Sequence, residues 1–169
     1  MTKLSISPYF ENYLRQVPET NVFEAFKNQQ PVIDSYFENI TEENSKFAYA
    51  EGKWSIKEMM QHVIDTERIM AYRALCFARG EKISLPGFDE NAYVSNSFAN
   101  KREWRSLVEE LKTLRISSVQ MFRSFDSSSL ENVGHANSKE MSPELMGLIM
   151  VGHIYHHKRV IEERYFGVQ

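Results

Sequence analysis

Sequence signals delimit one long helix near the middle of the chain. Ser55 and Glu58 form a capping box, in which each side chain accepts a hydrogen bond from the backbone N–H of the other residue. Gly80 supplies a stop, because glycine takes the left-handed conformation that ends a helix at little cost. We therefore expect a helix to about Arg79, with one apolar face at helical spacing: Ile56, Met59, Met60, Val63, Met70, Ala74 and Phe77.

Three further segments have amphipathic periodicity, at residues 21–39, 101–124 and 142–165. Pro31 removes one backbone hydrogen bond and is expected to kink or split the first of them. Asn100 and Glu103 are predicted to cap the second. Ser142 suits the N-cap of the third, and Pro143 suits its first helical position, where a missing N–H costs nothing.

The connections between these helices are polar, and seven glycines and five prolines are too few for many short strands. The predicted fold class is therefore all-α, with a four-helix bundle as its architecture. We expect no regular structure in residues 41–53, 81–100 and 126–142. The connection at 81–100 is long enough for the two helices that it joins to run parallel.

A single domain accounts for the 169 residues. Residues 1–20 are predicted to form an irregular lead-in that packs on the bundle, and residues 21–169 form the bundle domain. Tyr9, Phe10, Tyr13 and Leu14 are expected to make a helical turn over one end of the core.

Charge and hydropathy exclude several classes of protein. A formal net charge of −3 gives no electrostatic support for binding nucleic acid, and the apolar runs are far shorter than a membrane span. No basic segment followed by an apolar one opens the chain, so we expect no secretory signal. The single cysteine, Cys76, excludes an internal disulfide. These features predict a cytoplasmic protein with no nucleic-acid or membrane partner.

Three of the five histidines lie within five consecutive residues of the last predicted helix. His153 and His157 are one turn apart, offset by roughly 40° around the axis, so their rings can converge on a metal ion. His156 is also within reach of His153, and periodicity alone does not choose between them. His62 or His135 would complete a set of three imidazoles, which leaves an open position as in catalytic metal sites. The alternative is that the histidines pack without a metal.

The order of three sequence blocks resembles the DinB/YfiT-like superfamily: Gly52–Glu58, His62 with Asp65–Glu67, and Gly152–His157. The resemblance extends over nearly the whole chain from about Asn21. It implies a four-helix bundle with up-down-down-up topology and a divalent metal ion, zinc or nickel. The implied ligands are His62, His153 and His157, so His156 becomes a neighbour and His135 at most lies at the edge of the pocket.

The resemblance implies an activity class without a substrate. Members of the family include S-transferases and isomerases that use a low-molecular-weight thiol such as bacillithiol or mycothiol, and metal-dependent hydrolase is a common assumed activity. Glu67 is a candidate for accepting a proton in hydrolysis. Arg73 and Arg79 are candidates for binding an anionic group, with solvated helix charges as the alternative interpretation. Glu58, Asp65 and Glu67 are candidates for orienting His62, with a solvated helix face as the alternative interpretation for each.

Two alternatives to an enzyme with one metal ion follow from the same features. A bundle of this size can fold without metal, so a non-enzymatic, stress-related binding module is one of them. A di-iron site is disfavoured, because Glu58 precedes His62 by four residues and not by the three of the Glu-x-x-His motif. We expect a small-molecule substrate, and pairing of helical bundles makes a homodimer a further expectation.

Overall fold

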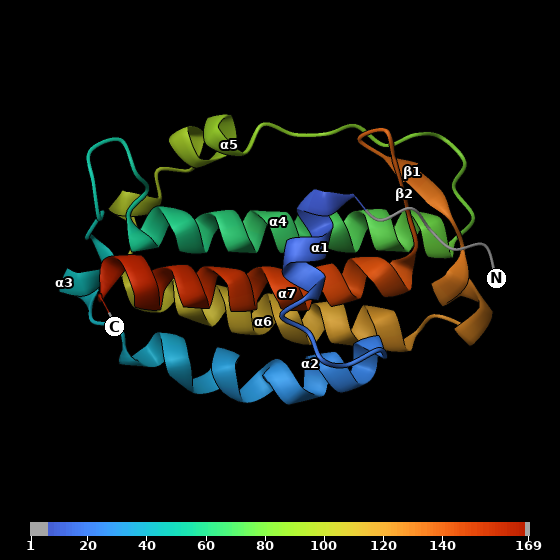
Figure 1. Ribbon diagram of the computed structural model, residues 1–169, viewed down its shortest axis with the longest axis horizontal. Helices are drawn as coiled ribbons and strands as arrows, with labels where there is room; N and C mark the ends of the chain where they lie inside the picture. Colours follow the sequence, from blue (N-terminus) through green and yellow to red (C-terminus); the bar gives the residue numbers. More distant parts are fainter. Residues whose placement is uncertain (1–6, 168–169) are drawn as a thin grey trace.

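The computed structural model describes residues 7–167, and four long helices form its bundle (Figure 1). In chain order these helices are α2 (Val22–Pro31), α4 (Ile56–Ala78), α6 (Trp104–Arg123) and α7 (Pro143–Val160). Figure 1 shows α2 and α7 running in one direction and α4 and α6 in the other. The predicted four-helix bundle and its up-down-down-up order are therefore confirmed.

The predicted signals at the ends of α4 and α7 act as expected. Glu58 accepts from the Ser55 backbone N–H at 2.7 Å, and the Ser55 hydroxyl accepts from the Glu58 N–H at 3.1 Å. Gly80 follows α4 with a φ of 83°. Ser142 caps α7 by accepting from the Leu145 N–H at 3.2 Å. Both helices that carry histidines are thus fixed at their N-termini by local hydrogen bonds.

The first predicted helix is split at Pro31, as expected. Its α-helical part ends at this residue and continues as a π-helical segment, Val32–Tyr36, and a 3₁₀ turn, Phe37–Asn39. Proline cannot donate the backbone hydrogen bond that a regular α-helix needs there.

The predicted start and cap of the third helix are wrong. Asn100 does not cap it but accepts from the Ser55 hydroxyl at 2.7 Å, and Glu103 makes no side-chain cap. Helix α6 begins at Trp104, whose backbone N–H donates at 2.7 Å to Glu42. Glu42 opens the short helix α3 (Glu42–Ser45), so this cap comes from far away in the sequence and no local pattern could reveal it.

All three predicted irregular connections contain regular structure, and the short helix α3 lies in residues 41–53. Of the two longer connections, the first holds α5 (Glu90–Ser97), which Asp89 caps by accepting from the Ala92 N–H at 3.1 Å. The second holds a 3₁₀ turn, Ser127–Glu131, and a hairpin of β1 (Gly134–Ala136) and β2 (Lys139–Met141). Its two turn residues, Asn137 and Ser138, have positive φ values of 49° and 60°. Serine is rare in such turns, which is why the sequence signal was weak.

The lead-in contains a helix, α1 (Pro8–Leu14), that crosses α7 (Figure 1). It covers α7 near its middle and not at the end of the core. Gly152 makes the crossing possible, because a Cβ at this position would lie 2.4 Å from the carbonyl oxygen of Tyr13. The close approach places the buried Tyr13 directly beside the histidines of α7.

A buried polar layer crosses the bundle between two apolar clusters. One cluster contains Phe26, Met70, Phe77, Phe122 and Met146, and the other contains Ile33, Ile56, Ile64, Leu107 and Ile154. Between them each of the four helices contributes buried polar residues: Gln29, His62, Thr66, Glu67, Arg115, Ser118 and His153. Within the described residues no helix is long and apolar enough to cross a membrane.

Candidate metal centre

Three histidines from two helices converge in the polar layer. His62 comes from α4, and His153 and His157 come from α7. The Nε2 atom of His153 lies 3.0 Å from Nε2 of His62 and 3.0 Å from Nε2 of His157. Among residues 7–167 these side chains form the one group of three potential ligands whose donor atoms gather within 4.8 Å of one another.

The geometry of this triad fits a divalent metal ion. Two nitrogens bound to one ion at about 2.1 Å lie about 3.0 Å apart at a right angle and about 3.4 Å apart at the tetrahedral angle. A neutral imidazole that carries its proton on Nδ1 presents Nε2 as an acceptor, so three converging Nε2 atoms need a cation or shared protons between them. The buried Nδ1 of His157 also has no hydrogen-bond partner in the described part of the chain.

Burial keeps the three rings neutral, which is the form that binds metal. It lowers the pKa of His62 to about 4, with a smaller contribution from the nearby His156 ring. Burial also lowers the pKa of His153 and of His157 well below the ordinary value for histidine, and the neighbouring imidazoles add to this effect.

Aromatic side chains form walls on two sides of the triad. The Trp54 ring lies 5.0 Å from that of His62, and the Tyr13 ring meets His153 edge-on at 5.3 Å. The hydroxyl of Tyr165 anchors the Trp54 segment by donating to its backbone carbonyl at 2.7 Å. These rings limit the access of water, which strengthens electrostatic interactions within the site.

Two cavities reach the triad from different sides. One has a volume of about 260 Å³, opens beside His157 and has aromatic walls, with this lining: Tyr49, Gly52, Lys53, Trp54, Met59, Asn91, His157, Val160 and Tyr165. The other has about 80 Å³, borders His153 and lies beneath α1. Two of the three histidines thus border a cavity, each from a different side.

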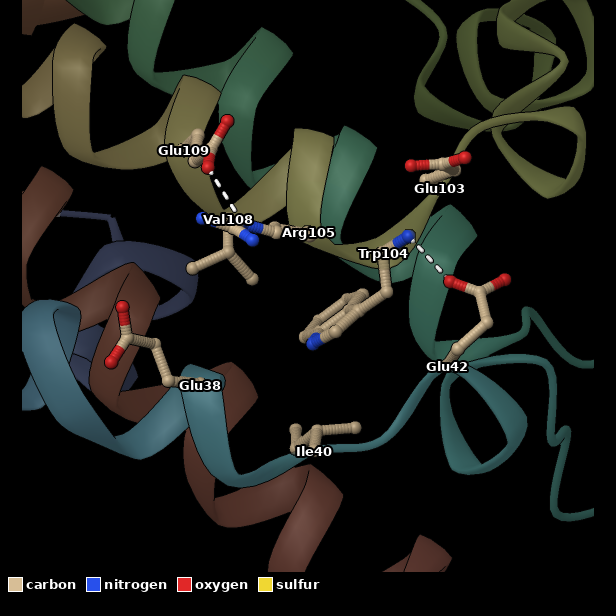
Figure 2. A pocket seen from close by; sticks show the side chains of 8 residues that line it. All are labelled: Glu38, Ile40, Glu42, Glu103, Trp104, Arg105, Val108 and Glu109. Carbon is tan, nitrogen blue, oxygen red and sulfur yellow. Dashed lines mark hydrogen bonds and ion pairs between the residues drawn. The ribbon is translucent and has the colours of Figure 1, made fainter.

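A larger hollow, of about 740 Å³, lies elsewhere, where α6 begins (Figure 2). Several glutamates line it, and each of three already has a partner. Glu42 accepts from the Trp104 backbone, Glu109 from Arg105 at 2.9 Å, and Glu38 from Lys112 at 2.5 Å. No histidine lines this hollow. Its size alone does not make it the better candidate, since three of its four glutamates already have partners and no group of potential metal ligands from residues 7–167 converges there.

The family follows from a direct comparison with known proteins. The family model of the DinB superfamily matches residues 25–161. This chain belongs to the DinB superfamily. The match contains all three histidines of the triad, and no curated protein matches the chain.

A solved structure shows the same fold as this DinB-superfamily chain. It is YfiT from Bacillus subtilis, described as a probable metal-dependent hydrolase with an unusual four-helix bundle topology. The two chains are 16% identical, with a TM-score of 0.71, over 96% of this chain and 90% of YfiT. At this identity the likeness establishes the fold.

The other two histidines predicted near the site of this DinB-superfamily protein lie outside the triad. His156 packs its ring on Tyr13 and on His157 without joining the triad. His135 lies on β1, is 53% exposed and faces Glu140 at 3.6 Å. The simple exposure considered for His135 is therefore observed. The half-exposed environment considered for His62 is not, because only 5% of that residue is exposed.

The charged candidates have partners of their own. Glu67 accepts from Arg115 through both carboxylate oxygens, at 3.0 and 2.8 Å, and from Ser118 at 2.9 Å. Arg73 is buried and donates to the backbone carbonyl of Pro86 at 2.7 Å.

The remaining charged candidates make no hydrogen bond or ion pair with the triad among the described residues. Glu58 is occupied in the capping box, and Asp65 accepts from Gln61 at 2.9 Å. Arg79 is exposed and lies over the Phe125 ring.

Sequence reasoning missed Arg115, Thr66 and the role of Tyr13. Arg115 stands in the apolar stripe of α6, between Leu111 and Ser118, and is fully buried. A charge at a core position is a readable signal, because buried arginines require a partner. Thr66 follows His62 by one helical turn, which places it on the same face of α4. The contact of Tyr13 depends on how α1 docks, so no local pattern indicates it.

Proposed function

We propose that the protein is a divalent-metal-dependent enzyme whose zinc or nickel ion is held by Nε2 of His62, His153 and His157. The observation that carries this proposal is the pair of 3.0 Å Nε2 contacts among three neutral rings. The description of YfiT as a probable metal-dependent hydrolase supports it. A divalent ion lowers the pKa of a water or thiol that binds to it and so supplies a nucleophile near neutral pH.

The side chains around the triad position a small substrate. The cavity beside His157 is slightly smaller than a typical ligand pocket of about 300–1,000 Å³, so it suits a compact molecule. Tyr49, Trp54 and Tyr165 offer apolar surface for the body of that molecule. Lys53 stands at the same cavity and can hold a negative charge on it.

The surroundings of the triad favour a thiol over water as the nucleophile. Glu67 is engaged by Arg115, and Glu90, the carboxylate that lines the cavity beside His153, accepts from the Tyr9 hydroxyl at 3.2 Å. A thiol with a pKa near 8.5 needs far less help to lose its proton than water, with a pKa near 15.7. We therefore propose transfer of a low-molecular-weight thiol, with hydrolysis as the second candidate.

In the proposed transfer the thiolate sulfur forms a bond to an electrophilic carbon. The leaving group departs from that carbon with the bonding electron pair, and the thiol proton passes to solvent. The chain's own part is to hold the ion, to exclude bulk water through Trp54 and Tyr13, and to seat the electrophile against the aromatic cavity wall.

Turnover with and without added thiol separates the two reactions. Zinc- or nickel-loaded protein would be incubated with 1-chloro-2,4-dinitrobenzene and cysteine, and in parallel with 4-nitrophenyl acetate alone. We expect thiol-dependent loss of chloride in the wild type and in His156→Ala, and none above background in His157→Ala. Ester cleavage without thiol would support the hydrolase instead. No turnover of either kind would favour the non-enzymatic binding module.

A further inference from the structure

The small cavity beneath α1 extends from the triad along one face of α4. His62, Thr66 and Arg73 occupy this face, because residues 4 and 11 positions apart are offset by only about 40° and 20° on a helix. Side chains of an α-helix lean toward its N-terminus, so Arg73 leans toward the histidines. His153, Thr66 and Arg73 all line the cavity, and Tyr9, Phe10 and Tyr13 of α1 form its roof.

Arg73 brings a buried positive charge without a negative partner. Only 5% of the residue is exposed. Among residues 7–167 its guanidinium makes no ion pair, and its hydrogen bond to the Pro86 carbonyl uses one of five N–H donors. The Phe88 ring lies 6.0 Å from the guanidinium carbon. A buried cation with no counter-ion is costly, so an anion in this cavity would be stabilising.

Thr66 adds an unpaired hydroxyl to the same cavity. Its Oγ1 atom is buried and has no hydrogen-bond partner in the part of the chain that the structure describes. Threonine in a helix usually bonds back to the carbonyl four residues earlier, and Thr66 does not. A buried donor without a partner costs about 1–3 kcal/mol, which a ligand oxygen would offset.

The remaining charges around the cavity leave a net positive balance. Lys139 of β2 also lines it and makes no ion pair within the described residues. Glu90 is the one carboxylate in the lining, against the two cations Arg73 and Lys139, and it already accepts a hydrogen bond from Tyr9. The Tyr9 hydroxyl in turn accepts from Tyr13 at 3.0 Å, so both tyrosines are committed to Glu90. Arg73 and Thr66 are left for a ligand.

We propose that this cavity is a carboxylate subsite, in which Arg73 and Thr66 bind the acid group of the substrate while its reacting carbon lies at the triad. The placement of the reacting carbon at the triad rests on the proposed function. The binding of an anion by Arg73 and Thr66 does not depend on it. A volume of about 80 Å³ is far below that of a complete ligand pocket, so it takes one small planar group. The fork of an arginine matches a carboxylate through two parallel hydrogen bonds.

Calorimetric titration with propionate, propionamide and inorganic phosphate tests this subsite. Each probe would be added at low ionic strength to metal-free and to zinc-loaded protein. We expect propionate to bind the metal-free protein and propionamide not to bind. Affinity for propionate should fall about tenfold in Arg73→Gln, since a hydrogen bond to a charged group contributes about that much. Arg79→Gln removes an exposed arginine at the C-terminal end of the same helix and should leave the affinity unchanged.

Thr66→Val keeps the shape of the side chain and removes only the hydroxyl. This variant tests the carboxylate subsite if Arg73→Gln does not fold. It should weaken propionate binding by about threefold. Equal binding of propionate and propionamide, or unchanged affinity in both Arg73→Gln and Thr66→Val, would overturn the subsite. Tighter binding of phosphate than of propionate would overturn the carboxylate assignment. Binding to metal-free protein that depends on Arg73 would uphold the subsite even if the chain retained no metal.

Discussion

Glu67 is bonded to Arg115 through both carboxylate oxygens, at 3.0 and 2.8 Å, in the interior of the bundle. Arg115 also donates at 2.7 Å to Gln29, whose amide donates at 2.7 Å to the backbone carbonyl of Val151. The network therefore joins all four long helices and reaches α7 two residues before His153. We infer that Glu67 stabilises the arrangement of α4 and α7 rather than exchanging protons with a substrate.

Replacing Glu67 with glutamine should destabilise the fold and leave the metal site intact. The change leaves the Arg115 charge buried without a counter-charge, which costs about 3–5 kcal/mol in free energy of unfolding. Urea denaturation measures that loss, and the double variant Glu67→Gln/Arg115→Met should recover most of it. Full stability combined with lost turnover would instead assign Glu67 to the reaction.

Substituting Gly152 with alanine should displace α1 from α7. The added Cβ would stand 2.4 Å from the Tyr13 carbonyl oxygen, and relief of such overpacking typically costs about 1–3 kcal/mol. Tryptic cleavage after Arg15, which follows α1, should become faster. Gly80→Asn is the matched control, because no atom lies within 4 Å of that position and asparagine tolerates a positive φ. Equal cleavage rates for Gly152→Ala and wild type would refute the close approach.

Acid should destabilise the metal-free protein between about pH 6.5 and pH 4. The pKa of His62 is about 4 in the fold and 6.5 when solvated, so the unfolded chain takes up a proton first as the pH falls. Stability is therefore fully present above pH 6.5 and decreases below it, by at most about 1.4 kcal/mol per pH unit for each such histidine. Urea midpoints measured with a chelator at several pH values give the slope. It should be shallower in His62→Gln, and an unchanged slope would contradict the burial of His62.

Local sequence signals predicted the parts of the fold that depend on neighbours in sequence. The Ser55–Glu58 box, the Gly80 stop and the break at Pro31 all lie within a few residues of the structure they determine. The cap of α6 by Glu42 and the docking of α1 on Gly152 could not be predicted in this way. Both depend on contacts between segments that only the folded chain brings together.

The histidine triad was likewise predicted only in part by local sequence patterns. Helical spacing indicated that His153 could pair with His156 or His157, and the family resemblance selected His157 and His62. The structure brings these three together and leaves His156 against Tyr13. The role of Thr66 could not be predicted, because it depends on the burial of a hydroxyl without a partner. The position of Arg115 in the apolar stripe of α6 does indicate a buried charge, but its partner Glu67 lies on another helix, so no local pattern identifies it.

The metal content of purified protein tests the central proposal most directly. Protein prepared without a metal-affinity tag would be analysed by inductively coupled plasma mass spectrometry, before and after incubation with zinc or nickel. We predict about one equivalent of divalent metal in the wild type and in the controls His135→Ala and His156→Ala, and little in His157→Ala. The folded His157→Ala protein should keep its helical circular dichroism, since the bundle is large enough to fold without metal. A wild-type protein that binds no metal after incubation, or a His156→Ala protein that loses as much as His157→Ala, would contradict the proposed site.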